Sequence, residues 1–269
     1  MKSTKKPRPR VNQPRANQPR VNQPRVNQPR ANQPRANQSR SAARVAASPE
    51  RMQRMLDAAG IRLNDGQLAQ LWRFDQLLRK RNQDRDLTRL IEFESVVVKH
   101  YIDSMYVGRL IDLPSPLVDI GTGAGFPGIP LKIRYPHLQL VLAEQRPRRV
   151  AFLNEAIATL QLRQTETFKQ RVVSRSFTTP MRGVITRAVE PIEKTLLRSS
   201  GCTRAGSRVI FLKGPGVDEE LASAAISFGR DYRLIQDEPY SLPNSPHQRR
   251  LVVIERLRDP VVDEPGDQR

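Results

Sequence analysis

The chain has 269 residues, a formal net charge of +19 and 38% hydrophobic residues. Its single cysteine, Cys202, excludes a disulfide framework and a thiolate metal cluster. The three histidines, His100, His137 and His247, are far apart in the sequence and argue against a zinc site. No apolar run has the length of a membrane span, and the basic N-terminus lacks the apolar core of a secretory signal. We therefore expect a protein without a bound metal in the reducing cytoplasm.

Residues 1–50 are unlike the rest of the chain. Residues 11–40 repeat units such as VNQPR and ANQPR, whose composition predicts a disordered tail, partly in the polyproline II conformation. The tail holds 12 lysines and arginines against one acid, or +11, and the remaining 34 bases and 26 acids give +8. Because both parts are basic, we expect a polyanion partner, nucleic acid before an anionic membrane. Two alternatives stay open: a generally cationic protein, and a natural start at Met52 or Met55.

Residues 51–112 are predicted to form a helical extension. Asn64 or Asp65 is a suitable N-cap for a long helix, in which leucines and Trp72 recur at helical spacing. A further helix is expected within 93–110, where apolar residues recur with the same period. We expect Trp72 to belong to the core rather than to a ligand site.

From Leu117 onward, short apolar runs alternate with helical patterns. Strands are predicted at 117–120, 138–143, 183–186, 208–212 and 250–254, and helices near 128–135, 147–160, 190–199 and 217–228. This alternation predicts an α/β fold with a doubly wound, mostly parallel sheet, which we assign to residues 113–258. Residues 259–269 are expected to be a disordered tail. In such a sheet, ligands bind beyond the carboxyl ends of the strands.

The most informative segment is LVDIGTGAGFPGIPLKI, residues 117–133. An apolar strand runs into Gly121, Gly123 and Gly125, and glycines let the backbone adopt positive φ and approach a bound molecule closely. Glu144 closes the next predicted strand, where a carboxylate can accept hydrogen bonds from both hydroxyls of a ribose. The segment therefore predicts a nucleoside-cofactor site.

Two cofactors compete for this site. Gly123, Gly125 and Gly128 satisfy the dinucleotide fingerprint G-x-G-x-x-G, but in that register the first glycine falls late in the turn. The order D-I-G-T-G-A-G instead places Asp119 at the strand end, where it can brace the loop or meet the methionyl ammonium of S-adenosylmethionine. We favour S-adenosylmethionine over a nicotinamide cofactor.

The sequence resembles the ribosomal RNA small-subunit methyltransferase G family, also called glucose-inhibited division protein B. The resemblance covers residues 52–257 and is carried by RNQDRDLTRL at 81–90, VKHYIDSM at 98–105, DIGTGAGFPGIPL at 119–131, RRVAFL at 148–153, VITRAV at 184–189, FLKG at 211–214 and RRLVVI at 249–254. It implies a Rossmann-like methyltransferase sheet and methylation of N7 of a guanine in small-subunit (16S) ribosomal RNA, with S-adenosylmethionine as donor. The partner would be this RNA or a ribosomal particle, and we expect a monomer.

The resemblance also implies site residues. By position, the cofactor contacts are Gly121, Gly123, Phe126, Glu144, Val172 and Val173. The residues themselves add Asp119 and Gly125. Val173 stands where the family usually has an acid, and Val189 stands where it usually has an aromatic residue. Arg187, in VITRAV, ends a predicted strand and is expected to contact the cofactor or the RNA, with an ordinary solvated arginine as the alternative.

Methylation of N7 needs no general base, because N7 carries a lone pair and no proton. Accordingly, we assign no catalytic residue. Candidates for phosphate contacts are Lys99, Lys213, Arg249 and Arg250, with a solvated charged face as the alternative. His100 and Asp103 lie three residues apart on one predicted helix face and could orient each other or cap the cofactor site, with a structural histidine as the alternative.

Two other classes of function remain open at this point. A non-catalytic RNA-binding or ribosome-assembly protein would keep the positive charge but would not need the glycine loop. An NAD(P)-dependent oxidoreductase should hold a proton-donating Tyr, His or Lys near the cofactor, and the sequence offers no such constellation.

Overall fold

The computed structural model of the protein describes residues 46–260 apart from 175, 188 and 244 and the side chain of Arg85. Of the predicted disordered tails, 1–50 and 259–269, residues 1–45 and 261–269 lie outside the described residues. Within the described part, the first helix already begins at Pro49, so the boundary at residue 50 was wrong by two residues.

Helices make up the N-terminal part of the described chain. Helix α1 (Pro49–Ala58) begins after Ser48, whose Oγ accepts a hydrogen bond from the Arg51 backbone at 3.2 Å. Helix α2 (Asp65–Arg85) begins at a capping box of Asn64 and Gln67, which confirms the predicted cap. The apolar stripe of α2 packs on the core, and Trp72 lies edge-on to Phe93 with ring centres 6.2 Å apart.

The last predicted helix of this part contains a π-helical turn. Helix α3 (Phe93–Val96) continues into the π-helix η1 (Val97–Ile102) and then into α4 (Asp103–Leu110). Such turns are rare and frequently occur at functional sites, since they change which residues share a helix face. The extent of this helix agrees with the prediction, and its π turn was not predicted.

A seven-stranded sheet follows, as the alternation of strands and helices predicted. Its strands are β1 (Leu117–Ile120), β2 (Leu140–Ala143), β3 (Thr165–Phe168), β4 (Met181–Arg187), β5 (Thr203–Lys213), β6 (Tyr232–Ser241) and β7 (Gln248–Arg256). The strand order is β3-β2-β1-β4-β5-β7-β6, with β1 to β5 parallel and β7 antiparallel to both neighbours. The five predicted strands are all present, and β3 and β6 were missed.

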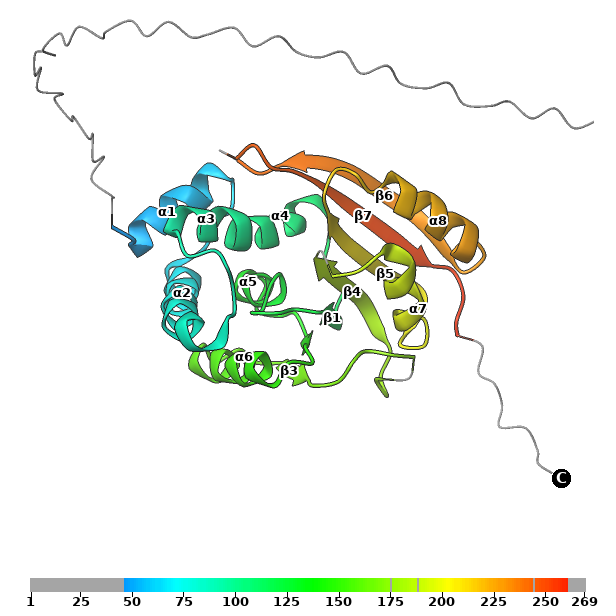
Figure 1. Ribbon diagram of the computed structural model, residues 1–269, viewed down its shortest axis with the longest axis horizontal. Coiled ribbons are helices and arrows are strands. Elements are labelled where there is room, and N and C mark those ends of the chain that lie inside the picture. Colours follow the sequence, from blue (N-terminus) through cyan, green and yellow to red (C-terminus); the bar gives the residue numbers. More distant parts are fainter. Residues whose placement is uncertain (1–45, 175, 188, 244, 261–269) are drawn as a thin grey trace, which may run out of the picture. The chain divides into compact units, whose positions relative to one another are not determined.

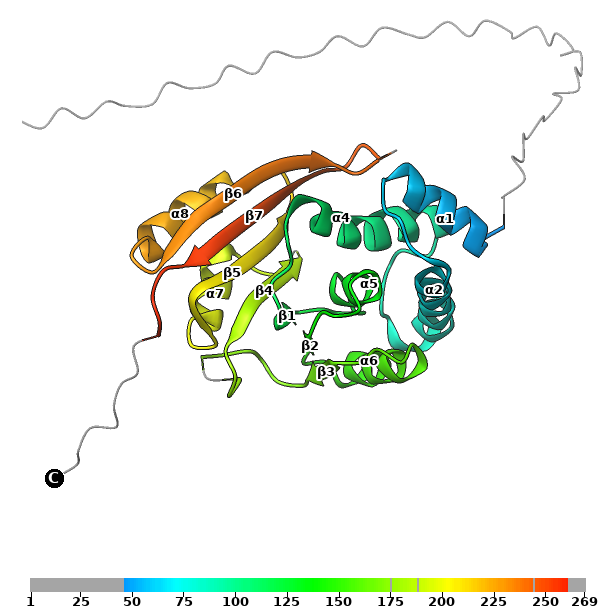
Figure 2. The ribbon, with the colours of Figure 1, turned by 180° about the vertical axis from the view of Figure 1, so that it is seen from behind.

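Helices cover both faces of the sheet (Figures 1 and 2). They are α5 (Gly128–Arg134), α6 (Pro147–Thr159), α7 (Ile192–Ser199) and α8 (Asp218–Phe228). Alternate residues along the strands face opposite ways, so that Leu117 packs in one core with α1 to α6 and Val118 packs in another with α7 and α8. The N-terminal helices thus share a core with the sheet. No described helix is both long and apolar enough to cross a membrane.

The order of the strands reverses between β1 and β4. From β1 the chain proceeds outward through β2 and β3, and then returns to the other side of β1 for β4 and β5. In doubly wound sheets, ligands bind at the carboxyl edge at such a switch point. The loop that begins at Gly121 and the end of β4 at Arg187 both lie at this edge.

Candidate active site

The glycine loop after β1 depends on backbone conformations that favour glycine. Gly121, Gly123 and Gly125 have φ of +71°, +62° and +94°. A side chain in the left-handed region costs about 1–2 kcal/mol. A Cβ on Gly125 would also collide with Ile129, whereas a Cβ on Gly123 would meet nothing closer than 3.6 Å. The backbone at Gly123 is therefore open to a ligand.

Asp119 at the end of β1 is fully buried and braces this loop. Its Oδ2 accepts hydrogen bonds from Thr122 Oγ1 at 2.6 Å and from the Gly128 backbone at 2.8 Å. Its Oδ1 is buried and has no partner among the described residues. Burial raises the pKa of this carboxyl to about 6, against the pull of its two hydrogen bonds. An unpartnered buried carboxylate oxygen is an acceptor suited to an ammonium group.

Glu144 follows β2, beside the glycine loop in the sheet order. Its Oε1 accepts hydrogen bonds from the backbones of Gln145 and Arg146 at 2.8 and 2.9 Å, and its Oε2 lies 3.7 Å from Arg149 Nη1. The side chain is 9% exposed and is fixed by these contacts. Oε2 is the oxygen that faces away from the backbone donors and is suited to a ribose hydroxyl.

The two valines implied as cofactor contacts lie in the segment after β3. Val172 is buried, whereas Val173 is 51% exposed and its backbone donates to Ser176 Oγ at 2.8 Å. Val189, beyond the end of β4, lies over Gly121, because a Cβ on that glycine would meet the Val189 side chain at 2.6 Å. Val189, which is 41% exposed, therefore stands at the rim of the loop.

These residues fit S-adenosylmethionine better than a dinucleotide. The unpartnered Oδ1 of Asp119 offers an acceptor to the ammonium group, and Glu144 offers one to a ribose. The two carboxyl groups are close enough for Glu144 to raise the pKa of Asp119. Glu144 would serve the ribose of either cofactor, so the acceptor at Asp119 is what favours S-adenosylmethionine, whose ammonium group a nicotinamide dinucleotide lacks. The carboxylate oxygens of Asp119 and Glu144 are thus the groups that fit the methyl donor.

Arg187 ends β4 and is held by a single helix. Its Nη1 donates to the Lys99 carbonyl at 2.9 Å and to Asp103 Oδ2 at 3.2 Å, and its Nη2 lies 3.2 Å from His100 Nδ1. Its guanidinium is also 5.5 Å from the centre of the Phe126 ring. With a side chain 17% exposed, Arg187 is not the ordinary solvated arginine of the alternative interpretation.

His100 and Asp103, on one helix face as predicted, both contact Arg187. They do not orient each other directly; each contacts the guanidinium. The His100 ring stacks on Phe126 at 4.3 Å and 15°, and its Nε2 lies 2.8 Å from Thr88 Oγ1. Burial, followed by the charge of Arg187, lowers the pKa of His100 to about 3. The ring is therefore neutral, with Nδ1 accepting from Arg187 and Nε2–H donating to Thr88.

Asp103 joins Arg187 to a second arginine. Its Oδ1 accepts from Arg249 Nε at 3.2 Å and from the Tyr240 hydroxyl at 3.4 Å. The carboxylate is buried, and one negative charge between two guanidinium groups leaves a net positive charge. A hollow of about 350 Å³ opens over this cluster, and it is lined by Leu90, Lys99, His100, Asp103, Arg187, Leu212, Lys213, Gly214 and Arg249. We call it the Arg187 hollow.

The four candidate phosphate contacts differ in how far their charge is already neutralised. Lys99, Lys213 and Arg249 line the Arg187 hollow, and Arg250 does not. Lys213 Nζ donates to Glu220 at 2.7 Å, and Arg250 is bound by two aspartates. The ammonium group of Lys99 has no hydrogen bond or ion pair to the described part of the chain. Lys99 and Arg249 are therefore the cations best placed to meet a phosphate.

Sequence reasoning did not assign functional contacts to Thr88 or Tyr240. Thr88 precedes Leu90 in a loop and holds His100, and Tyr240 comes from the missed strand β6. The one signal for Thr88 was its presence in the RNQDRDLTRL segment. Nothing in the local sequence indicates that Tyr240 meets a helix 137 residues earlier in the chain.

The fold and the site define a nucleoside-cofactor-binding domain of the doubly wound class. Residues 67–249 match the family described as rRNA small subunit methyltransferase G. A ribosomal RNA small subunit methyltransferase G 2 of Syntrophobacter fumaroxidans is 46% identical over 215 residues, which are 80% of this chain and 43% of that protein. One of Bdellovibrio bacteriovorus is 43% identical over 197 residues, 73% of this chain and 77% of that protein. The chain belongs to the rRNA small subunit methyltransferase G family.

Solved structures with a similar fold include a magnesium protoporphyrin IX methyltransferase of Synechocystis with bound S-adenosylmethionine. It aligns with 72% of this chain and 98% of its own, at 15% identity and a TM-score of 0.49.

Proposed function

We propose that the protein transfers a methyl group from S-adenosylmethionine to N7 of a guanine in small-subunit ribosomal RNA. The observation that carries the proposal is the glycine loop with the unpartnered Asp119 oxygen, in a chain of this family. The loop adjoins the cationic Arg187 hollow, because Phe126, which follows the glycines, stacks on His100 and lies under Arg187. A methyl donor and a polyanionic acceptor could therefore bind side by side at one edge of the sheet.

In this reaction the protein has to bind the methyl donor and the RNA, align the methyl group with N7, and exclude water. When bound, S-adenosylmethionine supplies a methyl group that is already strongly electrophilic. The glycine loop and Glu144 fix the nucleoside, and Asp119 fixes the amino-acid end. The N7 lone pair forms the new bond to carbon as the bond to sulfur breaks, so no proton has to be removed. Backbone carbonyls near the loop can stabilise the positive charge that moves to the base.

Arg187 lies between the loop and the hollow. Its hydrogen bonds to one helix fix its direction, and it lies over Phe126, which follows the glycines directly. We assign to Arg187 the orientation of the incoming nucleotide, with Lys99 and Arg249 binding phosphate. His100 acts on Arg187 as a positioning residue.

The acceptor is small-subunit RNA, as free RNA or in a ribosomal particle, and the protein acts as a monomer in the cytoplasm. The basic residues 1–50 would add affinity for phosphate without selecting the base, because their repeat has no means of holding a side chain in fixed geometry.

The decisive experiment is mass-spectrometric mapping of small-subunit RNA from a deletion strain before and after incubation with the protein and S-adenosylmethionine. We expect one guanine to gain 7-methylation. Calorimetry with S-adenosylmethionine, S-adenosylhomocysteine and NAD complements it. Binding of NAD alone would point to an oxidoreductase, and RNA binding without cofactor binding would point to an assembly protein.

A further inference from the structure

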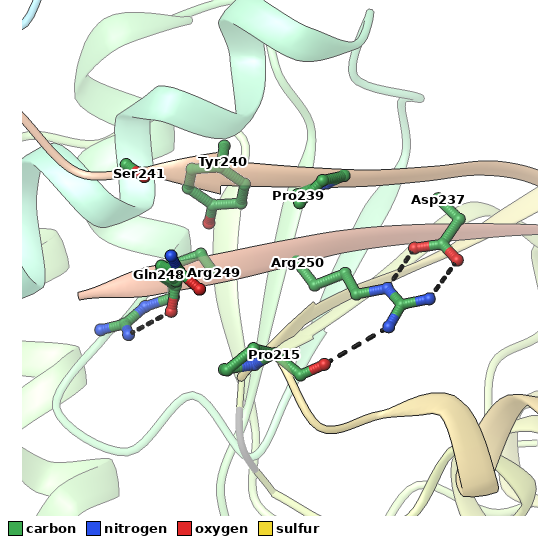
Figure 3. A pocket seen from close by; sticks show the side chains of 8 residues that line it. All are labelled: Pro215, Asp237, Pro239, Tyr240, Ser241, Gln248, Arg249 and Arg250. Atoms are coloured by element: carbon green, nitrogen blue, oxygen red, sulfur yellow. Dashed lines mark hydrogen bonds and ion pairs between the residues drawn. The ribbon is translucent and has the colours of Figure 1, made fainter. Parts of the chain in front are cut away.

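A second hollow adjoins the Arg187 hollow. It has a volume of about 380 Å³ and is lined by Pro215, Asp237, Pro239, Tyr240, Ser241, Gln248, Arg249 and Arg250 (Figure 3). We call it the hairpin hollow, because most of its lining belongs to β6 and β7. Arg249 lines both hollows, so they meet at this residue. Its size is within the range of pockets that bind small ligands, and a single nucleotide falls in that range.

The two hollows lie on opposite faces of the sheet. Arg249 bonds to Asp103, which begins α4, whereas Arg250 bonds to Asp218, which begins α8. The core shows the same alternation, since Leu251 packs with the N-terminal helices and Val252 packs with α7 and α8. Figure 3 shows Arg249 and Arg250 pointing away from each other along β7. A strand of RNA that occupied both hollows would cross the carboxyl end of β5.

The charge of the hairpin hollow differs from that of the Arg187 hollow. Arg250 Nε and Nη2 are bound by the two oxygens of Asp237 at 2.5 and 2.6 Å, and Nη1 is bound by Asp218 at 2.7 Å. Two carboxylates outweigh one guanidinium, so this group of three side chains carries a net negative charge and disfavours a phosphate. The exposed side chains of Gln248 and Ser241 instead offer neutral donors and acceptors, as does the edge of an unpaired base.

At Arg249, the junction of the two hollows, positive charge exceeds negative charge. Asp103 is shared by Arg187 and Arg249, and the ammonium group of Lys99 on the same side makes no hydrogen bond or ion pair within the described residues. The junction therefore retains positive charge, and the hollow beyond it does not. The two hollows and the cationic junction between them match two consecutive nucleotides: each hollow would hold one base, and the junction would bind the phosphate that links them.

We propose that the hairpin hollow binds the unpaired nucleotide next to the methylated guanine, with its base against Gln248 and Ser241 and the linking phosphate on Arg249. This proposal rests on the proposed function and adds a subsite to it. The protein would read part of its target outside the reaction centre. It would also need an unstacked, single-stranded acceptor, because a paired neighbour could not turn into the hollow.

The first test places a carboxylate in the hollow. Gln248→Glu keeps the size of the side chain, removes its N–H donors and adds a negative charge that repels RNA. Gln139→Glu is the matched control, since Gln139 is exposed just before β2 at the opposite edge of the sheet. Methyl transfer to small-subunit RNA should show KM for RNA raised about fivefold by Gln248→Glu and unchanged by the control. Equal KM values for both variants would overturn the proposal.

The second test locates the RNA. Cys202 is buried, so a thiol-specific photo-crosslinker will react at a cysteine introduced by Ser241→Cys. After irradiation, reverse-transcription stops should fall on the nucleotide adjacent to the methylated guanine. Thr159→Cys, exposed at the end of α6, should give no such stop. Stops only at distant positions would overturn the subsite and leave the methyltransferase intact. If the wild-type protein methylates no RNA, the proposed function fails, and the subsite fails with it.

Discussion

The glycine loop and the Arg187 hollow lie at one edge of the sheet but are built by opposite means. The loop is a single contiguous segment in which backbone shape does the binding, with three glycines at positive φ. The hollow draws its side chains from η1, α4, β4, β5 and β7, and depends on charge and orientation. Shape fixed by covalent neighbours should be insensitive to salt, whereas charge gathered from distant segments should respond to it.

Replacing Gly123 by leucine should have the largest effect. The left-handed backbone there and the open space in front of it mean that a side chain would stand where the cofactor approaches. We expect affinity for S-adenosylmethionine to fall by at least about 100-fold, measured by calorimetry. Gly206→Leu is the matched control, because Gly206 also has positive φ, at +82°, and open space around it. If both variants lose affinity equally, backbone strain rather than ligand contact is responsible.

The same difference decides what could be predicted from the sequence. The loop and Asp119 could be predicted because they lie in one contiguous motif, and Glu144 could be predicted because it closes the next apolar run. The shared role of Asp103 was not, because Arg187 and Arg249 lie 84 and 146 residues away from it.

The missed strands have physical reasons of their own. The edge strand β3 is the short polar segment TETF, which has no apolar run. The other edge strand, β6, contains Asp237, Glu238 and Pro239, and proline and charge are tolerated at a sheet edge because one side lacks a partner. The π turn in VVKHYI has no sequence signature that periodicity could reveal.

Arg187→Ala should reduce methyl transfer to small-subunit RNA by about 100-fold, or about 2.7 kcal/mol, because it removes the group that orients the acceptor. The contacts of Arg187 with Lys99, His100 and Asp103 argue for some loss of stability as well. We expect about 1–3 kcal/mol from thermal unfolding, since a buried carboxylate loses one of its two arginines. His100→Gln, which can still accept from Arg187, should retain most activity, and loss of kcat as large as in Arg187→Ala would assign His100 a direct role.

Acidification should weaken cofactor binding through Asp119. Its pKa of about 6 means that the carboxyl becomes protonated between pH 7 and pH 5 and can no longer attract an ammonium group. Affinity for S-adenosylmethionine should then fall by up to about tenfold for each pH unit below 6. Asp119→Asn should bind weakly with an affinity that does not change over this range. Calorimetry from pH 5 to pH 8 on both proteins gives the comparison, and parallel curves would exclude Asp119 as the ammonium partner.

The same group should affect stability with the opposite sign. Because burial raises the pKa of Asp119 above its unfolded value, the folded protein without cofactor binds the proton more tightly. Its contribution to the free energy of unfolding therefore rises as the pH falls from about 7 to about 4. Denaturant titrations should show the wild type gaining stability relative to Asp119→Asn over that interval. A gain in the reverse direction would mean that Oδ1 has a cationic partner in the protein itself.

Lys99→Ala should have the smallest effect and separates the two regions most directly. Lys99 contributes charge to the Arg187 hollow, and its ammonium group makes no hydrogen bond within the described residues, so its loss should spare the fold. We expect KM for RNA to rise about threefold at low salt, with the slope of log affinity against log salt shallower by about 0.7, the share of one phosphate on a single strand. The matched control is Lys80→Ala, on an exposed position of α2 outside the hollow, which should leave both quantities unchanged. Raising the salt to about 0.5 M should bring Lys99→Ala and the wild type together, because screening removes the advantage of the extra charge. The defect of Gly123→Leu should persist at that salt, since a side chain in the path of the cofactor is not screened. If high salt also restored the activity of Gly123→Leu, the glycine loop and the Arg187 hollow would not act independently through shape and charge.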